Sequence, residues 1–188
     1  MHRQFTLALL GCVMSAPAFA ADSYTIDPRH TFPVYEINHF GWSTQRGRFD
    51  KVTGRVVLDR AAKTGSVDVT IDVAYVDTGV DKLNEHLKSA DFFDVAKYPT
   101  MTFKSTKIVF EGDKPASVPG QLTLHGVTKP VTLTISRFHC AFNEFVKKEV
   151  CGADATTTIK RTDFGMNYLA PGLGEEVKLL LNVEASKD

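Results

Sequence analysis

Histidine is the side chain of this protein best suited to bind a metal or to transfer a proton near neutral pH. The sequence has no His-x-x-x-His, His-Glu-x-x-His or Cys-x-x-Cys spacing, the patterns that build a local metal site. Beyond His2, the histidines are scattered: His30, His39, His86, His125 and His139. We therefore expect no metal, with a site assembled only by folding as the alternative. His125 precedes Gly126 and is predicted to lie in a tight turn.

Nucleophilic or acid-base catalysis is also not indicated. The chain lacks the Gly-x-Ser-x-Gly motif of an activated serine, and Ser89 lies in a stretch typical of a helix end. Asp163 follows Arg161 by two residues, so on an extended chain the two side chains share a face and could pair. No second carboxylate is placed beside Asp163, which favours a structural ion pair or turn anchor over a catalytic acid. We predict a protein that is not an enzyme and needs no catalytic cofactor.

Residues 1–20 have the pattern of a cleaved export signal. A basic start at His2 and Arg3 is followed by a mostly apolar run, and Ala18-Phe19-Ala20 supplies a small-x-small cleavage site. The apolar run is shorter than the roughly 20 residues that a spanning helix needs. Cleavage and lipidation at Cys12 is the alternative. We expect a periplasmic protein without stable membrane insertion, while secretion or surface display remains open.

The mature chain is expected to be one domain, residues 21–188. Its 168 residues are enough for a sizeable core and leave little room for a second domain. Loss of Arg3 leaves 21 basic against 22 acidic side chains, a net charge of −1. The mature chain therefore has no basic field with which to bind nucleic acid or an anionic membrane.

Cys140 and Cys151 are the cysteines of the mature chain. An even pair in a chain bound for an oxidising compartment predicts a disulfide, with two free thiols as the alternative. The bridge would close a loop of roughly a dozen residues and contribute about 3 kcal/mol to stability. Nothing near either residue resembles a redox motif, so a structural role is expected.

Most of the remaining chain alternates apolar and polar residues, the period of a strand with one apolar face. Such segments cover residues 34–40, 52–58, 67–73, 101–103, 108–110, 122–124, 131–135, 156–160 and 176–185. Alternation favours antiparallel pairing over a parallel sheet covered by helices. We predict a mainly β protein: a closed antiparallel barrel of about eight strands. A two-sheet sandwich is the alternative.

One stretch departs from the strand pattern. Leu83, Leu87 and Ala90 recur as on one face of a short helix, before alternation resumes at Met101 and Phe103. Between them lie the aromatic pair at positions 92 and 93 and a break at Pro99. A short helix and two aromatic rings at the rim of a barrel predict the mouth of a cavity. The alternative is that the aromatic residues only fill a core.

Four motifs occur in order along the chain. They are residues 39–41 (His-Phe-Gly) with 47–49 (Gly-Arg-Phe), 86–93 (His-Leu-Lys-Ser-Ala-Asp-Phe-Phe) with 97–99 and 102–103, 120–131 (Gly-Gln-Leu-Thr-Leu-His-Gly-Val-Thr-Lys-Pro-Val), and 161–165 (Arg-Thr-Asp-Phe-Gly). Together they resemble the YceI-like family over residues 24–184. The resemblance implies an exported bacterial protein with a lipocalin-like barrel that binds long isoprenoid chains, including polyprenyl quinones such as ubiquinone, in an internal tunnel.

The resemblance and the strand pattern also suggest ligand-binding residues. Carried over from the motifs as tunnel-lining candidates are Phe49, Leu87, Phe92, Phe93, Phe103 and Phe164, with His39 as a polar contact. Leu83 joins them on the helix face of Leu87, and strand parity adds Tyr35, Ile37, Met101 and Leu133. His39 shares the parity of Tyr35, so it is either a polar ligand contact or a core histidine with its own partner.

We therefore expect a periplasmic binder or carrier of a long-chain isoprenoid lipid, such as a polyprenyl quinone. One alternative is an exported enzyme in which His39 acts on a lipid or quinone head group. Another is a structural exported domain without a ligand. The family's members occur in more than one oligomeric arrangement, so a homodimer is an open alternative.

Overall fold

The strands of this protein have one face toward an interior space and one toward water, as the alternation of the sequence predicts. In the last strand, Val177, Leu179 and Leu181 line the interior, whereas Lys178 has an exposed side chain. The structure is a computed structural model and describes residues 21–188. The predicted export signal, residues 1–20, and the alternative lipidation site at Cys12 lie outside the described residues.

The described residues form mostly strands, with three short helical segments. Their bounds in chain order are β1 (Asp22–Ile26), β2 (Phe32–His39), β3 (Ser43–Phe49), β4 (Val52–Asp59), β5 (Thr64–Asp72), the 3-10 helix η1 (Val73–Tyr75), β6 (Val76–Asp77), α1 (Asp81–Lys88), β7 (Thr100–Ser105), β8 (Val109–Glu111), β9 (Lys114–Leu124), β10 (Val127–Asn143), β11 (Lys148–Lys160), the 3-10 helix η2 (Arg161–Phe164) and β12 (Leu173–Lys187).

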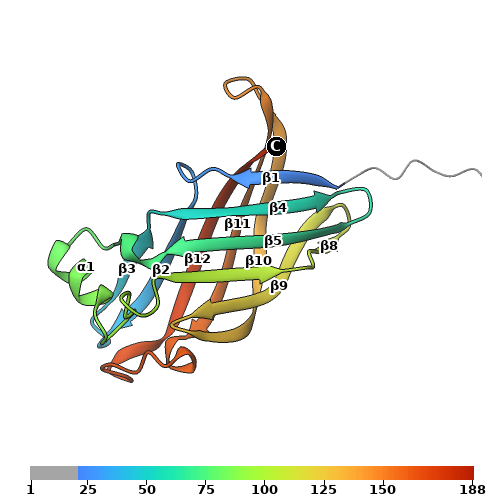
Figure 1. Ribbon diagram of the computed structural model, residues 1–188. Coiled ribbons are helices and arrows are strands. Elements are labelled where there is room, and N and C mark those ends of the chain that lie inside the picture. The colour runs from blue at the N-terminus through green and yellow to red at the C-terminus, as the bar shows by residue number, and fades with distance from the viewer. Residues whose placement is uncertain (1–20) are drawn as a thin grey trace, which may run out of the picture.

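Eight strands close into an antiparallel barrel, in the order β1-β4-β5-β7-β9-β10-β11-β12 and back to β1 (Figure 1). The ring closes where Tyr24 and Ile26 of β1 pair with Lys187 and Ala185 of β12. Closure removes the unpaired edges that an open sheet would expose. The prediction of a lipocalin-like antiparallel barrel of about eight strands with one short helix is confirmed, and the sandwich alternative is wrong.

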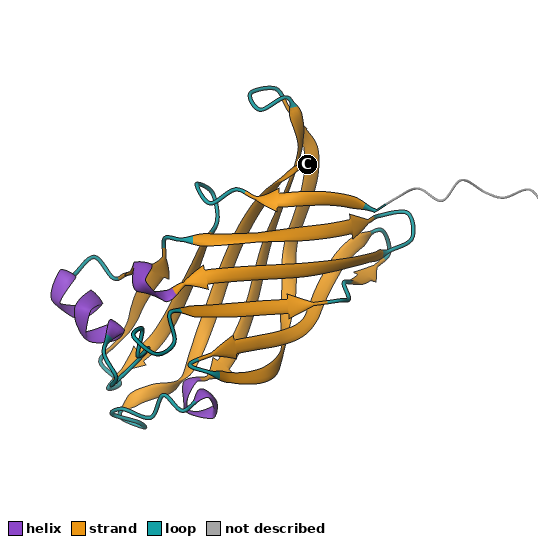
Figure 2. Cartoon of the chain, in the orientation of Figure 1, coloured by secondary structure: helices purple, strands orange, loops and turns teal. Residues whose placement is uncertain are grey.

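The remaining strands extend this ring. β12 pairs with β1 near its C-terminal end and with β2 over most of its N-terminal part, and β2 continues to β3 and β6. Figure 2 shows the helical segments on the lower left side of the barrel, away from the tip of the β10–β11 hairpin at the top. The chain therefore builds an end with helices and loops, where the cavity opens, from segments distant in sequence.

Local geometry explains two features of β9 and β10. His125 and Gly126 connect them, with φ of 51° and 76°, which is the pair of positive values that a two-residue hairpin turn requires. The predicted tight turn is confirmed. Further along β10, the register shifts between Ile135 and Arg137. Because a bulge reverses strand parity, both Ile135 and Phe138 line the interior.

The β10–β11 hairpin extends beyond the ring (Figure 1). Cys140 and Cys151 face each other across this hairpin, with their Cα atoms 4.1 Å apart, and form a disulfide. The predicted bridge is confirmed. Between this disulfide and the tip of the hairpin, the Tyr24 hydroxyl donates to Glu149 Oε1 at 2.6 Å, and Arg60 donates to the same carboxylate. These contacts attach the hairpin to β1 and to the turn after β4.

Candidate functional site

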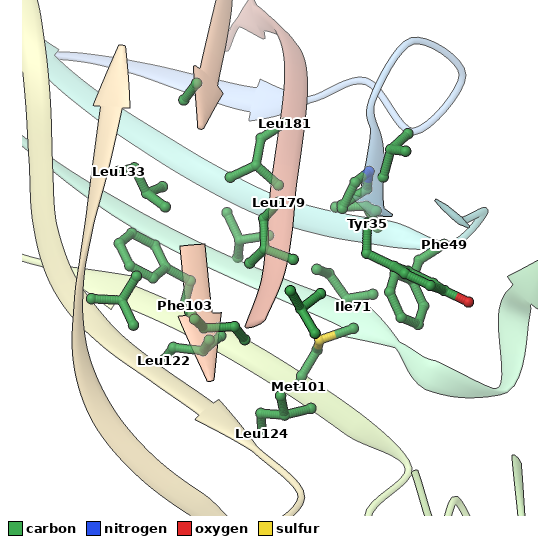
Figure 3. A pocket seen from close by; sticks show the side chains of 18 of the residues that line it. Tyr35, Phe49, Ile71, Met101, Phe103, Leu122, Leu124, Leu133, Leu179 and Leu181 are labelled. Atoms are coloured by element: carbon green, nitrogen blue, oxygen red, sulfur yellow. The ribbon is translucent and has the colours of Figure 1, made fainter. Parts of the chain in front are cut away.

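The barrel encloses a cavity of about 620 Å³. Its wall is built by inward-facing apolar side chains of the ring strands, and Figure 3 shows several of them around the same interior space. Those labelled there from β5, β7, β9, β10 and β12 are Ile71, Met101, Phe103, Leu122, Leu124, Leu133, Leu179 and Leu181. A cavity of this size and character is the usual form of a site for an apolar small molecule.

Eleven of the twelve predicted ligand-binding residues lie on this wall. They are Tyr35, Ile37, His39, Phe49, Leu83, Leu87, Phe92, Phe93, Met101, Phe103 and Leu133. They come from β2, β3, α1, the segment after α1, β7 and β10, so only folding brings them together. Their contact with a ligand stays a prediction.

Phe164 is the exception, and its predicted place in the tunnel wall is wrong. Its side chain is 2% exposed in the hydrophobic core, within η2, and is not part of the cavity wall. Its carbonyl oxygen lies 3.1 Å from His125 Nδ1, which connects η2 to the β9–β10 turn. The motif at residues 161–165 singled out Phe164, but a sequence motif does not say where a ring points. The ring enters the core because η2 turns away from β11.

Aromatic rings narrow the cavity at the end near α1. The rings of Phe49 and Phe93 meet edge to face with centroids 5.6 Å apart, and Tyr35 lies 6.1 Å from Phe49. Phe93 is held there because its backbone N–H donates to the carbonyl oxygen of Leu87 at the end of α1. The predicted helix therefore contributes Leu87 to the wall directly and positions Phe93 through this hydrogen bond.

α1 is fixed over the cavity by its polar side. Asn84 accepts hydrogen bonds from the backbone N–H and the hydroxyl of Thr78, at 2.8 and 2.7 Å, and donates to Asp77. Asp77 also accepts from the backbone N–H of Gly79, which with Asn84 lowers the pKa of this carboxyl. Beside Asn84 on the helix surface, Leu83 and Leu87 line the cavity.

His39 lies at the cavity mouth, not deep in the barrel. It is the last residue of β2, and its ring packs edge-on against Phe40 and Trp42, with centroids 4.9 and 5.8 Å apart. Polar side chains from the same end of the barrel join His39 on the wall: Gln45, Arg46, Thr78 and His86. The cavity thus has a polar group of residues at its mouth and mostly apolar walls beyond it.

Sequence reasoning missed Arg161 as a structural residue of the site. Its side chain is 3% exposed and donates to the carbonyl oxygens of Met166, Leu173 and Gly174. Burial lowers its pKa, although arginine remains charged at neutral pH. Among residues 21–188, no ion pair joins Arg161 to Asp163, so the predicted pairing is wrong and the turn-anchor alternative applies to Arg161 itself.

Many further wall residues also went unassigned. They include Val67, Val69, Ile71, Leu122, Leu124, Val177, Leu179 and Leu181. The strand parity that selected Met101 and Leu133 could have found them, because inward positions recur every second residue.

Other kinds of site are not built by the described part of the chain. Within residues 21–188, no group of three His, Cys, Asp or Glu side chains is placed to hold a metal ion. In the same range, no helix has both the length and the apolar character to cross a membrane. The cavity is therefore the candidate functional site.

Fold and site together define a class: closed antiparallel barrels that enclose an apolar ligand cavity at one open end. Residues 24–185 match the YceI-like domain. A UPF0312 protein of Vibrio cholerae is 37% identical over 180 residues, which cover 93% of each chain. This chain belongs to the YceI-like family.

Solved structures agree with the fold. A Campylobacter jejuni YceI protein is 30% identical, with a TM-score of 0.70 over 81% of this chain and 90% of that one. A domain from Saccharophagus degradans described as polyisoprenoid binding has a TM-score of 0.65 at 18% identity, over 88% of this chain and 98% of that one. At that identity the second likeness concerns the fold alone.

Proposed function

We propose that this protein binds a long-chain isoprenoid lipid in its cavity and carries or stores it without altering it. The observation that carries this proposal is the cavity of about 620 Å³, with mostly apolar walls and polar residues at the mouth. Membership of the YceI-like family and the likeness to a polyisoprenoid-binding domain support the same ligand class.

The tail of such a lipid is apolar, and so is most of the cavity wall. A prenyl tail has no hydrogen bonds to satisfy, and burying it gains roughly 25 cal/mol per Å² of apolar surface, minus the cost of ordering the chain. The ring strands supply side chains such as Phe103, Leu122 and Leu179 along the path of such a tail.

Within this class, we assign a polyprenyl quinone such as ubiquinone. A quinone ring carries carbonyl oxygens that accept hydrogen bonds, and the donors of the site are concentrated at the mouth. Arg46, Gln45 and His86 lie on the wall there together with His39. The head group would then lie among these side chains, with the tail extending into the barrel.

We assign the protein to the periplasm, as an exported carrier. The export pattern of residues 1–20 supports this. The Cys140–Cys151 disulfide is also characteristic of an oxidising compartment. In such a compartment, a prenyl quinone is nearly insoluble, so a barrel that covers its tail would let it move through water.

A binding role is favoured over the enzyme alternative. Catalysis on a head group by His39 would need an acid or base partner to orient or charge the ring. Within the described residues, the His39 ring packs against the aromatic rings of Phe40 and Trp42, and no hydrogen bond joins it to a carboxylate.

The test is to express the protein with its own export signal in a bacterium, purify it without detergent and identify extractable lipids by mass spectrometry. We expect a polyprenyl quinone or related isoprenoid at close to one per protein. A lipid-free extract from folded protein would contradict the proposal, and a chemically altered ligand would favour the enzyme alternative.

Two variants connect the ligand to the cavity. Phe103→Asp places a charge on the apolar wall, and Phe93→Asp does so near α1, where the side chain is only half-buried and folding is less at risk. Both should lose most of the extractable lipid while keeping the β circular-dichroism spectrum. Phe145→Asp, the same change at a fully exposed hairpin position, is the matched control and should retain lipid.

A further inference from the structure

Exposed apolar side chains are concentrated around the cavity mouth. Six of the ten large, exposed apolar side chains of the described residues lie on the segments that surround it: Phe40, Trp42, Val80, Leu83, Tyr168 and Leu169. We call these six residues the rim. Three of the other four lie at the tip of the β10–β11 hairpin, which is a separate patch. Contiguous exposed apolar surface of this kind marks an interaction site.

The rim is continuous because its three segments contact one another. Phe40, in the β2–β3 turn, packs over Gly172 of the loop between η2 and β12, and His39 pairs with Leu173. From the same loop, the Tyr168 ring meets His86 of α1, with centroids 5.8 Å apart. It also meets the ring of Phe92, at 5.2 Å.

The rim is also continuous with the interior. Phe40, Leu83 and Leu169 are exposed to solvent and yet lie on the cavity wall. Beside the polar residues of the mouth, apolar side chains therefore connect the outside of the molecule with the inside of the barrel.

Two of the rim segments carry no formal charge. Residues 38–45 and 164–174 contain no Asp, Glu, Lys or Arg, although 23% of the chain is charged. A surface without charges loses no ion solvation when it enters a less polar medium. Trp and Tyr are the side chains most favoured at the membrane–water interface. This composition is complementary to a neutral bilayer interface. The third segment, α1, carries two acidic and two basic side chains, Asp81, Lys82, Glu85 and Lys88, so it adds no net charge.

The backbone supports a functional reason for the rim. Phe40 and Leu169 have φ of 53° and 55°, in the left-handed region that bulky residues rarely adopt. Glycine or asparagine would relieve this strain. Strain that is retained to present two large apolar side chains points to a functional constraint at the site.

We propose that the rim docks on the neutral interface of a lipid bilayer, so that a lipid passes between membrane and cavity without crossing water. The identity of the lipid rests on the proposed function, whereas the docking does not. Trp42, with 81% of its surface exposed, would enter the interface, and the mouth would then face the membrane.

The first test uses Trp42 as a probe, because it is the single tryptophan of the chain. Mixing the protein with neutral phosphatidylcholine vesicles should shift its emission to the blue, and lipids brominated on the acyl chain should quench it. The binding should change little between about 0.05 and about 0.5 M salt, since no ion pairs contribute. An unchanged spectrum together with no flotation on vesicles would overturn the proposal, as would binding that requires anionic lipid and disappears with salt.

The second test places the surface by vesicle flotation. Trp42→Ser combined with Val80→Ser changes two rim residues that are not part of the cavity wall and should lower partitioning about tenfold or more. Phe145→Ser, at a hairpin residue 97% exposed, is the control and should float like the wild type. Loss of flotation in the control but not in the double variant would overturn the proposal.

Docking and ligand binding can be separated with the short isoprenoid alcohol farnesol, added from solution and followed by calorimetry. The double variant should bind farnesol like the wild type, which shows that its cavity is intact. Should it fail to, the single variant Trp42→Ser replaces it, because Trp42 is not part of the cavity wall. Normal docking by a protein that neither binds farnesol nor carries lipid would contradict the proposed function alone.

Discussion

At the residue scale, the close approach of Tyr35 and Gly47 shapes the cavity. The two residues pair across β2 and β3, and a Cβ at position 47 would overlap the Tyr35 ring, with Cε1 only 2.7 Å away. Glycine is therefore needed there for space, since Gly47 has no positive φ. The Tyr35 ring occupies the space that a side chain at position 47 would take, and it narrows the cavity beside Phe49.

We predict that Gly47→Ala destabilises the protein by about 1–3 kcal/mol, the usual cost of overpacking. In a Tyr35→Leu background the cost should fall, because the smaller side chain leaves room for the methyl group. Urea unfolding of the four proteins of this double-mutant cycle measures the coupling. Equal costs of Gly47→Ala in both backgrounds would show that the Tyr35 ring is not what excludes a side chain.

Tyr24 and Glu149 form a second residue-scale contact, with consequences for pH. Burial, and then the hydrogen bond to Glu149, raise the pKa of Tyr24, whereas the same hydrogen bond is the main reason that the pKa of Glu149 is lowered. A lowered folded-state pKa contributes stability that is present above the ordinary glutamate pKa and is lost as the pH falls through the lowered value.

Tyr24→Phe should therefore cost about 1 kcal/mol at pH 7, a value reduced for the partial exposure of Glu149. The difference from the wild type should shrink as the pH is lowered through the folded-state pKa of Glu149. It should also shrink above the ordinary tyrosine pKa, where the raised pKa of Tyr24 makes folding of the wild type less favourable. Denaturant titrations across this pH range measure the decrease at low pH and the decrease at high pH. A stability difference that does not change with pH would show that the hydrogen bond between Tyr24 and Glu149 is not its cause.

At the element scale, one buried guanidinium organises the loop between η2 and β12. Arg161 donates to three carbonyl oxygens, that of Met166 in the loop and those of Leu173 and Gly174 at the start of β12. The loop contributes Tyr168 and Leu169 to the rim. A change at this buried residue can therefore alter the mouth of the cavity through the loop that it holds.

Arg161→Leu should lower the free energy of unfolding by about 3 kcal/mol or more, because three buried carbonyl groups would lose their donor. Limited proteolysis should then cut within residues 165–172 faster than in the wild type. The control is Arg137→Leu, a change of the same chemistry at an exposed position of β10, which should do neither. Identical unfolding curves for the Arg161 variant would show that water replaces the guanidinium at little cost.

At the scale of the whole molecule, a cavity of about 620 Å³ means that the barrel without ligand forgoes packing contacts that a filled core would have. A ligand that binds the folded state alone adds stability in proportion to the logarithm of its concentration over its dissociation constant. The protein should thus be measurably more stable with lipid than without it.

Protein stripped of lipid should melt at a lower temperature than protein purified with its ligand. Adding farnesol at about 100 times its dissociation constant should raise the melting temperature by several degrees, since the expected gain is about 2.7 kcal/mol. Phe103→Asp should show little of this gain. Equal melting temperatures with and without lipid, measured by calorimetry, would contradict a ligand held in the barrel.

The sequence by itself determined what is local. Alternation specified the strands and their antiparallel character, as in Val177, Leu179 and Leu181, and His125-Gly126 specified a tight turn. The helix at Leu83 and Leu87 followed from its period, and the disulfide from an even pair of cysteines. These features depend on side-chain period and on backbone preferences of a few neighbouring residues, which the sequence states directly.

The tertiary structure decided what depends on contacts between distant segments. β1 closes the barrel on β12 through residues about 160 positions apart, and strand parity says nothing about such a partner. Phe164 turned into the core, and Arg161 paired with carbonyl groups instead of Asp163, because η2 redirects the chain. The rim likewise exists only because the β2–β3 turn, α1 and the η2–β12 loop meet at one end, where ring closure leaves the cavity open.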